Sequence, residues 1–497
     1  WRAQALVRGV CLLLCAVKAT AREGSVGHTI RMYRAAWSCS VPPVWGKMEN
    51  MEDMKEEREE VREEEHGLTR RTFIKGAVAA GAVLAGGAVL GHDTLVKWLQ
   101  RMGFYPFSDG FYVERLRQIV TQDPCSGRVI MWETPKESAG QMLEVQAPDV
   151  DNVLRFPAVD AAFTDDDVTV HQYLVEVDQL VPGVEYRYRI TADGGTTAWL
   201  PLVTPDPDLP YKMLLFPDSQ SSDYADWQQM AHLAWARNTD AAFFACLGDL
   251  VDNGEDRYQW TEFFKGVDEM ERVIPMAPVM GNHETYDRQW QTRLPVAYLN
   301  YFRTPRNGSK AFGRYYYSFD YGQAHYIVLC TQQKEIDGFK SGLVEEQLAW
   351  IRRDLKAHRK KWNIVLMHKD VLQYRIHGRP ERSEGIDEEI GRVWMPVFDE
   401  LLIDVVFTAH LHTYRNRGHI YAFAKTPEQK GPLYILTGVA GNVRYPNLWI
   451  DHAFDEVTLP QPETDNYLTM EVAADQIEIA CFLPDGTEMD RVTVTKQ

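Results

Sequence analysis

The sequence lacks the cysteine pattern of a disulfide-rich protein. Seven cysteines occur among 497 residues, and no two of them form a CxxC pair. Cys246 and Cys330 lie in apolar runs typical of strands, which predicts buried thiols. Cys125 and Cys481 can pair only if the fold brings them together. The cysteines therefore indicate no disulfide framework and identify no redox compartment.

The sequence also lacks a basic stripe. Lysine and arginine total 53 against 71 acidic residues, which gives a formal net charge of −18. The densest acid lies in the run from Glu49 to Glu65, which we interpret as a solvated, unfolded segment. Proteins that bind nucleic acid concentrate positive charge on one face, so no nucleic-acid partner is expected. Length and hydrophobic content fit two folded domains with additional segments.

A long hydrophobic run is missing from the N-terminal region. The apolar stretch from Gly76 to about Leu90 is shorter than the ~18 residues of a stable membrane span. The residues before it, Thr69 to Lys75, read T-R-R-T-F-I-K and resemble a bacterial twin-arginine export signal. The alternative is an ordinary membrane helix that begins with two arginines. We expect export through the twin-arginine translocon to the periplasm, the cell envelope or the exterior.

The boundaries of this segment follow from what surrounds it. Neither an A-x-A cleavage site nor a lipobox cysteine follows the apolar stretch, so the signal is either cleaved nearby or retained as a membrane tether. Met48 or Met51 would start an ordinary n-region. We therefore expect residues 1–47 to be upstream sequence without a structural role, 48–92 to hold the acidic n-region and signal, and 93–110 to be a linker.

Short strands separated by turn residues fill 111–205. The candidates are Val129 to Trp132, Tyr173 to Val177 and Tyr186 to Ile190. About seven such strands in roughly a hundred residues predict a fibronectin-like or immunoglobulin-like β-sandwich. The segment L-x-P-G-x-x-Y-x-Y, which begins at Leu180, resembles the N-terminal domain of purple-acid-phosphatase-like proteins. We expect a scaffold or substrate-positioning role for this domain.

Strands alternate with helices in 206–497, after a linker predicted from Pro201 to Pro210. This alternation predicts an α/β layered domain, an αββα sandwich with C-terminal strands. The predicted helices are Asp226 to Arg237 and Leu343 to His358. The predicted strands are Met213 to Phe216, Ala241 to Leu247, Ile274 to Val279, Ile364 to Met367, Val405 to Thr408 and Leu433 to Leu436.

Polar clusters follow five of these strands, where open α/β sheets place their ligand sites. The clusters are Asp218-Ser219-Gln220, Gly248 to Gly254, Gly281-Asn282-His283-Glu284, His368, and His410-Leu411-His412. A single aspartate or histidine after a strand is more often a cap or a structural residue. Five together form a set of carboxylates, amides and imidazoles that suits two Fe, Mn or Zn ions, divalent or trivalent. One bridging carboxylate can hold two ions about 3.5–4 Å apart.

In this order the clusters resemble the motifs of the calcineurin-like metallophosphoesterases, from about Lys212 to Val443. The resemblance implies that Asp249 bridges the two metals. It assigns Asp218 and His412 to the first metal, and Asn282, His368 and His410 to the second. It makes His283 an outer-sphere catalytic histidine, which Asp252 orients.

Three residues depart from the family pattern. Gln220 stands where the first motif usually has a metal-binding histidine, so that site either has a weaker ligand or uses water instead. Asp252 stands where purple acid phosphatases have a metal-binding tyrosine, which implies that their charge-transfer colour is absent. Ala409 replaces a glycine before His410, at some cost in backbone freedom.

Two arginines near the last motif are candidates for binding substrate. Arg415 follows the histidine pair, and Arg444 lies in the loop after Gly438 to Gly441. Arginine matches phosphate oxygens in geometry and charge, whereas the alternative reading is ordinary surface charge. The stretch from Arg375 to Arg382 is interpreted as a solvated or substrate-facing loop.

The motifs predict hydrolysis of a small phosphate mono- or diester by metal-activated water. One alternative is a nuclease, cyclic nucleotide phosphodiesterase or phospholipase that uses the same site. The acidic balance argues against nucleic acid, and no lipid-binding helix is evident apart from the signal. Another alternative is a non-catalytic surface binding protein with a relict metal site, which only Gln220 supports.

Overall fold

The computed structural model describes residues 113–426, 429–459 and 465–496. All of them belong to one compact unit, Tyr105–Gln497. The predicted export signal, the acidic run and the segments assigned to 1–47 and 93–110 lie outside the described residues. Among the residues that are described, no helix is long and apolar enough to cross a membrane.

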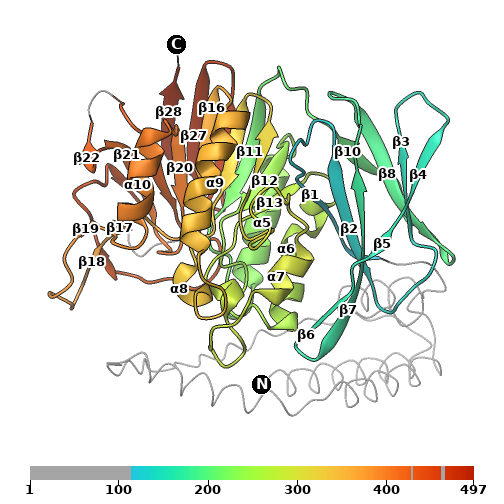
Figure 1. The fold of residues 1–497 in the computed structure, drawn as a ribbon, viewed down its shortest axis with the longest axis horizontal. Helices are drawn as coiled ribbons and strands as arrows, with labels where there is room; N and C mark the ends of the chain where they lie inside the picture. Colours follow the sequence, from blue (N-terminus) through green and yellow to red (C-terminus); the bar gives the residue numbers. More distant parts are fainter. Residues whose placement is uncertain (1–112, 427–428, 460–464, 497) are drawn as a thin grey trace, which may run out of the picture. The chain divides into compact units, whose positions relative to one another are not determined.

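The largest sheet has eleven strands and runs through the whole unit (Figure 1). Its strands are β1 (Glu114–Ile119), β2 (Arg128–Thr134), β5 (Val159–Asp160), β6 (Phe163–Asp165), β7 (Val168–Val177), β11 (Tyr211–Phe216), β12 (Phe243–Cys246), β13 (Met276–Pro278), β26 (Tyr467–Val472), β27 (Gln476–Phe482) and β28 (Glu488–Thr495). The strand order is β28-β27-β26-β11-β12-β13-β1-β2-β7-β5, and β6 pairs with β7. Strands β11, β12 and β13 are parallel.

A second sheet of eight strands faces the first. Its strands are β14 (Tyr317–Tyr321), β15 (Ala324–Val328), β16 (Trp362–Leu366), β20 (Val405–Thr408), β21 (Tyr414–Tyr421), β22 (Ala424–Lys425), β23 (Leu433–Thr437) and β25 (Val457–Thr458). The order is β14-β15-β16-β20-β23-β21-β22, with β25 beside β21, and β15, β16, β20 and β23 are parallel. Two short pairs, β17 (Leu372–Gln373) with β19 (Gly385–Ile386) and β18 (Arg375–Ile376) with β24 (Trp449–Ile450), lie in the loops around it.

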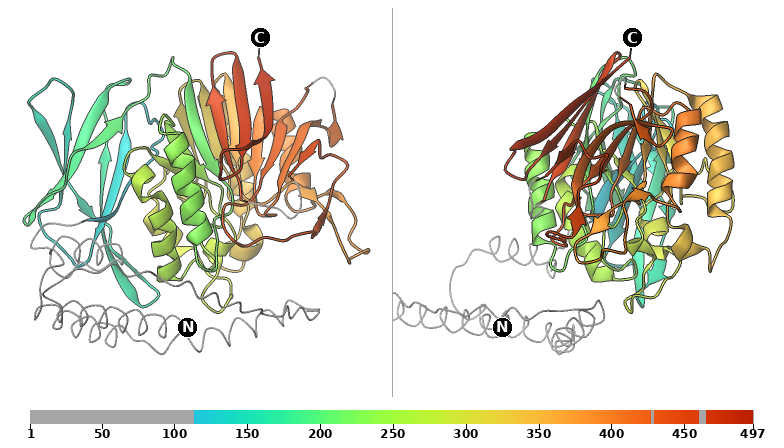
Figure 2. Two further views of the ribbon diagram at one scale, coloured as in Figure 1. Left: turned by 180° about the vertical axis from the view of Figure 1, so that it is seen from behind. Right: turned by 90° about the vertical axis from the view of Figure 1, so that its left-hand side faces the viewer.

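Helices cover the outer faces of the two sheets, as Figure 2 shows. They are α5 (Ala225–Arg237), α6 (Arg257–Glu271), α7 (Val296–Tyr301), α8 (Gln333–Ile336), α9 (Leu343–His358) and α10 (Gly391–Glu400). Successive side chains of β11 point to opposite faces of the largest sheet, and both faces are apolar. Met213 and Leu215 belong to the core between the sheets, whereas Leu214 and Phe216 belong to the cluster that contains Trp227 of α5. Strands buried on both faces need apolar side chains in both directions.

The N-terminal strands include a third sheet of five strands. It consists of β3 (Met142–Gln146), β4 (Val153–Pro157), β8 (Glu185–Ala192), β9 (Gly195–Thr196) and β10 (Leu200–Val203), in the order β10-β8-β3-β4 with β9 beside β8. A separate hydrophobic cluster joins its buried residues to those of β2 and β7, including Trp132 and Tyr188. The N-terminal strands also join the largest sheet directly, because Ile119 of β1 pairs with Met276 of β13.

The α/β fold predicted from the strand–helix alternation is confirmed. Helix α9 and strand β20 have the predicted bounds, and the other predicted elements differ at their ends by at most a few residues. The predicted linker from Pro201 to Pro210 is wrong at its start, because Leu200–Val203 forms strand β10. Proline is tolerated there because β10 is an edge strand. The four described cysteines are buried and free, so Cys125 and Cys481 do not pair.

Candidate metal centre

The polar clusters lie at the carboxyl ends of parallel strands in both large sheets. Asp218 follows β11, Asp249 follows β12 and Asn282 follows β13. From the second sheet, His368 follows β16, and His410 and His412 follow β20. Because the two sheets face each other, their carboxyl ends form one edge of the unit, and the structure brings these side chains together there.

Two groups of ligand-type atoms share one carboxylate. Asp249, His368 and His410 form one group, and Asp218, Asp249 and His412 form the other. Within each group the ligand-type atoms lie within 4.8 Å of one another. Asp218, Asp249, His368 and His412 are at least 98% buried. A carboxylate that belongs to both groups has the position required of a bridging ligand.

The first group converges on one ring nitrogen. Nε2 of His368 lies 3.0 Å from Oδ2 of Asp249, 3.2 Å from Oδ1 of Asn282 and 3.2 Å from Nδ1 of His410. Asn282 thus joins this group through its amide oxygen. In the second group, Nε2 of His412 lies 3.4 Å from Oδ1 of Asp218. A buried cluster of acceptor atoms fits a cation, because a cation satisfies all of them at once.

Backbone carbonyls fix which ring nitrogen faces the centre. Nδ1 of His368 lies 2.9 Å from the carbonyl oxygen of Leu247, and Nδ1 of His412 contacts the carbonyl oxygen of Val443. Only a protonated Nδ1 can donate to a carbonyl, so Nε2 is the ring nitrogen that each histidine turns toward the carboxylates. This second contact orients metal-binding histidines in proteins.

Gln220 is buried beside the same loops. Its backbone N–H donates to the carbonyl of Asp249, and its side chain is 99% buried. Its Oε1 atom has no hydrogen-bond partner among the described residues. An orphaned buried oxygen is costly, and a cation would satisfy it. The chemistry of Gln220 therefore fits a weak oxygen ligand, as the sequence analysis allowed.

His283 lies at the border of the cluster. Its Nε2 is 3.9 Å from Oδ2 of Asp249, and its backbone N–H donates to Oδ1 of the same carboxylate at 2.9 Å. Its Nδ1 donates to the backbone carbonyl of Asp252 at 2.7 Å, whereas the Asp252 carboxylate is 3.9 Å away. The hydrogen bond that orients this ring therefore comes from the Asp252 main chain. Tyr286 and Trp290 contact the ring edge-on.

Glu284 is a buried residue of the Gly281-Asn282-His283-Glu284 cluster, for which the sequence predicts no role of its own. Its carboxylate accepts backbone N–H groups of Asp249 at 3.0 Å, Leu250 at 2.8 Å and Gly281 at 2.6 Å. Burial and the neighbouring Asp249 raise its pKa to about 8. Glu284 thus joins the two loops that carry Asp249 and Asn282. Its place after a candidate ligand was the only sequence signal for this role.

The backbone of the centre is strained in a way that brings the ligands together. Asp249, His410 and His412 all have positive φ angles, of 49°, 76° and 53°. Such conformations are uncommon outside glycine and cluster at functional sites. Gly281 has a further constraint, because a Cβ atom there would lie 2.1 Å from Oδ1 of Asp249. The packing of these loops therefore leaves no room for a larger residue.

The two imidazoles of the first group differ in charge. Burial disfavours a charged ring, but the Asp249 carboxylate outweighs it and raises the pKa of His368 to about 9. Burial and the neighbouring His368 hold the pKa of His410 well below its ordinary value. For Asp249, burial opposes ionisation, yet His368 and His283 hold its pKa well below the usual range. An ionised carboxylate and a neutral imidazole are the forms that bind metals.

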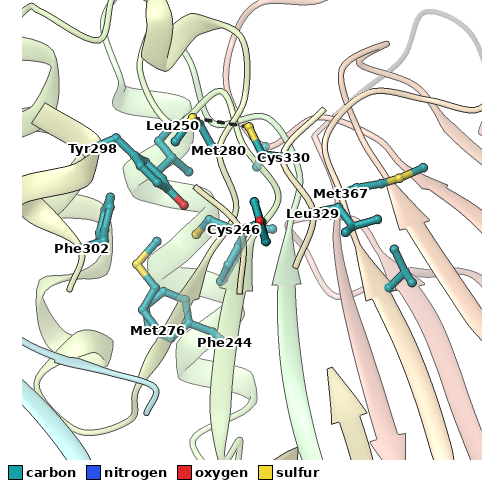
Figure 3. Packing of buried hydrophobic residues seen from close by; sticks show 14 of the residues in the cluster. Phe244, Cys246, Leu250, Met276, Met280, Tyr298, Phe302, Leu329, Cys330 and Met367 are labelled. Atoms are coloured by element: carbon teal, nitrogen blue, oxygen red, sulfur yellow. Dashed lines mark hydrogen bonds between the residues drawn. The ribbon is translucent and has the colours of Figure 1, made fainter. Parts of the chain in front are cut away.

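Buried apolar residues flank the candidate ligands in the sequence, with Leu250 after Asp249 and Met280 before Gly281. Figure 3 shows both in one hydrophobic cluster with Cys246, Met276 and Cys330. The Sγ atom of Cys330 contacts Sδ of Met280 at 4.0 Å. Burial raises the pKa of the Cys330 thiol to about 12, so this cysteine is a neutral packing residue.

The two candidate substrate arginines occupy different environments. Arg415 is fully buried, with Asp455 and Asp451 each 3.4 Å from its guanidinium. Arg444 is partly exposed and pairs with Asp465 and Asp226. Both therefore have internal carboxylate partners, and a role in binding substrate stays a prediction. In the stretch from Arg375 to Arg382, residues Arg375 and Ile376 form strand β18.

Comparison with known proteins agrees with this geometry. Residues 211–414 match the calcineurin-like phosphoesterase family. Purple acid phosphatase 21 of Arabidopsis thaliana is 26% identical over 274 residues, which cover 54% of this chain and 58% of that protein. Purple acid phosphatase 15 of the same plant is 29% identical over 214 residues, covering 41% and 36%. The chain thus spans less than two thirds of the length of these relatives.

Solved structures show the same fold. A purple acid phosphatase from yellow lupin (Lupinus luteus) seeds superposes with a TM-score of 0.64 at 15% identity, over 77% of this chain and 74% of that one. The structure of PhoD superposes with a TM-score of 0.56 at 14% identity, over 79% and 89%. The match of residues 211–414 to the calcineurin-like phosphoesterase family and the curated relatives support the predicted assignment to metal-dependent phosphoesterases, and the solved structures share the fold.

Proposed function

We propose that this protein is an exported hydrolase of phosphate mono- or diesters that works with two metal ions. The observation that carries the proposal is the position of Asp249, which belongs to both groups of ligand-type atoms. A single mononuclear site would not need a carboxylate common to two groups. A two-metal phosphoesterase needs a ligand of this kind.

The residues divide into two ligand sets around Asp249. Asp218 and His412 would hold the first ion, together with Gln220 as a weaker oxygen ligand. Asn282, His368 and His410 would hold the second. Mixed oxygen and nitrogen donors without thiolates suit Fe, Mn or Zn. Bound ions would polarise the phosphoryl group and lower the pKa of water.

His283 assists the reaction from outside the ligand sets. The Asp252 carbonyl holds Nδ1 as a donor, so Nε2 faces the centre. In its protonated form the ring donates a hydrogen bond to the phosphoryl or leaving-group oxygen. Edge-on contacts with Tyr286 and Trp290 support its orientation.

A phosphatase or small-molecule phosphodiesterase fits the chain better than the alternatives. The net charge of −18 disfavours a polyanionic nucleic acid substrate. A relict binding protein would have no reason to retain the two buried ligand groups and the ring orientations that accompany them. The substrate is a small phosphorylated molecule in this proposal.

The remaining parts of the proposal concern organisation and location. The N-terminal strands of 111–205 form a fibronectin-like β-sandwich that shares the Trp132 and Tyr188 cluster, ahead of a catalytic domain in 206–497. The arginine pair Arg70-Arg71 and the apolar stretch after it direct a bacterial chain to the twin-arginine translocon. The retained or cleaved signal would then place the enzyme at the membrane, in the periplasm or outside the cell.

Replacing Asp249 with Asn tests the proposed chemistry. The variant keeps the shape of the side chain but removes the shared negative charge, so turnover of a chromogenic phosphate ester should fall by at least ~10²-fold. Asp337→Asn, at an exposed position, is the matched control and should retain wild-type turnover. Wild-type turnover in folded Asp249→Asn protein would overturn the proposal.

A further inference from the structure

A small cavity lies away from the candidate metal ligands. Leu174, Glu176, Arg303, Thr304, Arg306 and Arg314 line a cavity of about 170 Å³. Leu174 and Glu176 come from strand β7, and the other four come from the loop between α7 and β14. No predicted metal ligand lines it. Three of its six lining residues are arginines, so the chemistry of the cavity is dominated by guanidinium groups.

Several buried donor atoms of this cavity have no hydrogen-bond partner in the described part of the chain. Nε of Arg303, together with Nε and Nη1 of Arg314, is buried without a hydrogen bond, as is the hydroxyl of Thr304. Buried donors without acceptors are costly, and a bound ligand that accepts several hydrogen bonds removes the cost. The cavity therefore has donors in place and lacks acceptors.

Positive charge exceeds negative charge among the residues that line the cavity. Arg303, Arg306 and Arg314 face one another, and Glu176 is the one carboxylate among the lining residues. Burial together with Arg303 and Arg306 lowers the pKa of Arg314 to about 10. Like charges gathered in a partly buried space repel each other unless an anion lies between them.

The loop that carries the arginines is held in place by its own contacts. The Asn307 side chain donates to the carbonyl and hydroxyl of Ser318 and accepts the Ser318 backbone N–H. Trp350 of α9 donates to the Asn307 carbonyl at 2.9 Å. Arg314 itself has a φ of 72°, a conformation that arginine seldom adopts. Strained backbone that persists because surrounding contacts hold it in place is common at binding sites.

A second cavity of about 450 Å³ shares Arg306 and Arg314 with the first. Gly308, Ser309, Lys310, Ala311 and Gly313 line the rest of it. It adds a lysine and a serine hydroxyl to the basic lining. The shared arginines therefore stand between a small space suited to one oxyanion and a larger, open space beside it.

We propose that Arg303, Arg306 and Arg314 form a second oxyanion site, distinct from the metal centre, which binds phosphate. Guanidinium groups match phosphate oxygens in both geometry and charge. The small cavity holds the phosphate, either as the free ion or as the phosphate group of an organic molecule whose remainder lies in the larger cavity. The site is proposed to bind phosphate without hydrolysing it, because none of the predicted metal ligands lines it.

The test uses calorimetric titration of the metal-loaded, full-length protein with inorganic phosphate. Arg306→Gln removes one exposed arginine of the site without disturbing the core. Arg359→Gln removes an exposed arginine at the end of α9 and is the charge-matched control. Phosphate that binds at the metal centre is identified separately, as competitive product inhibition of ester hydrolysis.

Wild-type protein should show two classes of phosphate site. Arg306→Gln should weaken the non-inhibitory class by about tenfold or more, the loss of one charge-assisted contact, and leave the product-inhibition constant unchanged. Arg359→Gln should change neither. The thermal midpoint without phosphate checks that each variant is folded. Phosphate should raise that midpoint more in wild type than in Arg306→Gln.

Parallel titration with phenylphosphonate, which has a carbon–phosphorus bond, separates the two ligand sources. Tighter binding of phenylphosphonate identifies an organic phosphate, and tighter binding of inorganic phosphate identifies the free ion. The proposal is overturned if wild type shows only the inhibitory class of site. It is equally overturned if Arg306→Gln and Arg359→Gln give the same isotherm as wild type.

Discussion

Adding one methyl group at Gly281 should disable the metal centre. A Cβ atom at this position would lie 2.1 Å from Oδ1 and 2.2 Å from the backbone N of Asp249. Ordinary contacts of a Cβ atom begin at 3.4 Å, so carboxylate and methyl must separate by about 1.3 Å (3.4 − 2.1). A misplacement of about 1 Å in a catalytic constellation costs about 10²-fold in rate. Gly281→Ala should therefore reduce kcat/KM by at least that factor.

The same displacement should weaken metal binding, because Asp249 is the ligand common to both groups. The assay combines kcat/KM on a chromogenic phosphate ester with metal content after dialysis. Gly338→Ala is the matched control, since a Cβ atom there meets nothing within 4 Å. If folded Gly281→Ala protein keeps the turnover and metal content of Gly338→Ala, the reasoning about this close contact is refuted.

Two further predictions concern stability away from the centre. Glu133 is 98% buried, and its carboxylate lies 2.7 Å from Arg115 and 2.9 Å from Arg257. Because Glu133→Gln removes one partner of a buried ion pair, it should lower the free energy of unfolding by about 3–5 kcal/mol in urea titrations. A loss below about 1 kcal/mol would contradict this. For His325, burial opposes the charged ring, but hydrogen bonds to two carboxylates, including Asp354, raise its pKa above 6.5. Its contribution is thus fully present below about pH 6.5 and is lost as pH rises through the raised pKa. The deficit of His325→Gln should therefore shrink as pH rises above about 6.5, and a deficit independent of pH would contradict the assignment.

The candidate metal ligands could be predicted because each of them is marked by its immediate neighbours in the sequence. Each candidate ligand stands directly after an apolar run, and parallel strands bring their carboxyl ends to one edge. The motif predicts Asp249 as the shared ligand, and Asp249 belongs to both groups of ligand-type atoms. Chain order and strand polarity therefore carry most of the information about this site.

Other features depend on long-range packing that sequence patterns do not encode. The pairing of Ile119 with Met276 joins the N-terminal strands to the largest sheet across more than a hundred residues. Helix α10 was missed because Pro396 interrupts its helical pattern. The sequence leaves Arg415 as either a substrate-binding or a surface arginine, yet it is fully buried against Asp455.

The contact between Asp252 and His283 shows that sequence patterns do not reveal main-chain hydrogen bonds. Its side chain was the predicted partner of His283, whereas the hydrogen bond comes from its backbone carbonyl. A residue type says little about main-chain contacts, since every residue has a carbonyl. Glu284 was similarly hidden, because its three acceptor contacts are all with backbone N–H groups.

Anomalous diffraction from crystals of the metal-loaded protein tests the central claim most directly. Data collected at the absorption edges of the bound metals locate each ion independently of activity. The account predicts two peaks about 3.5–4 Å apart, with the Asp249 carboxylate between them. A single peak, or two peaks of which only one lies beside Asp249, would contradict it.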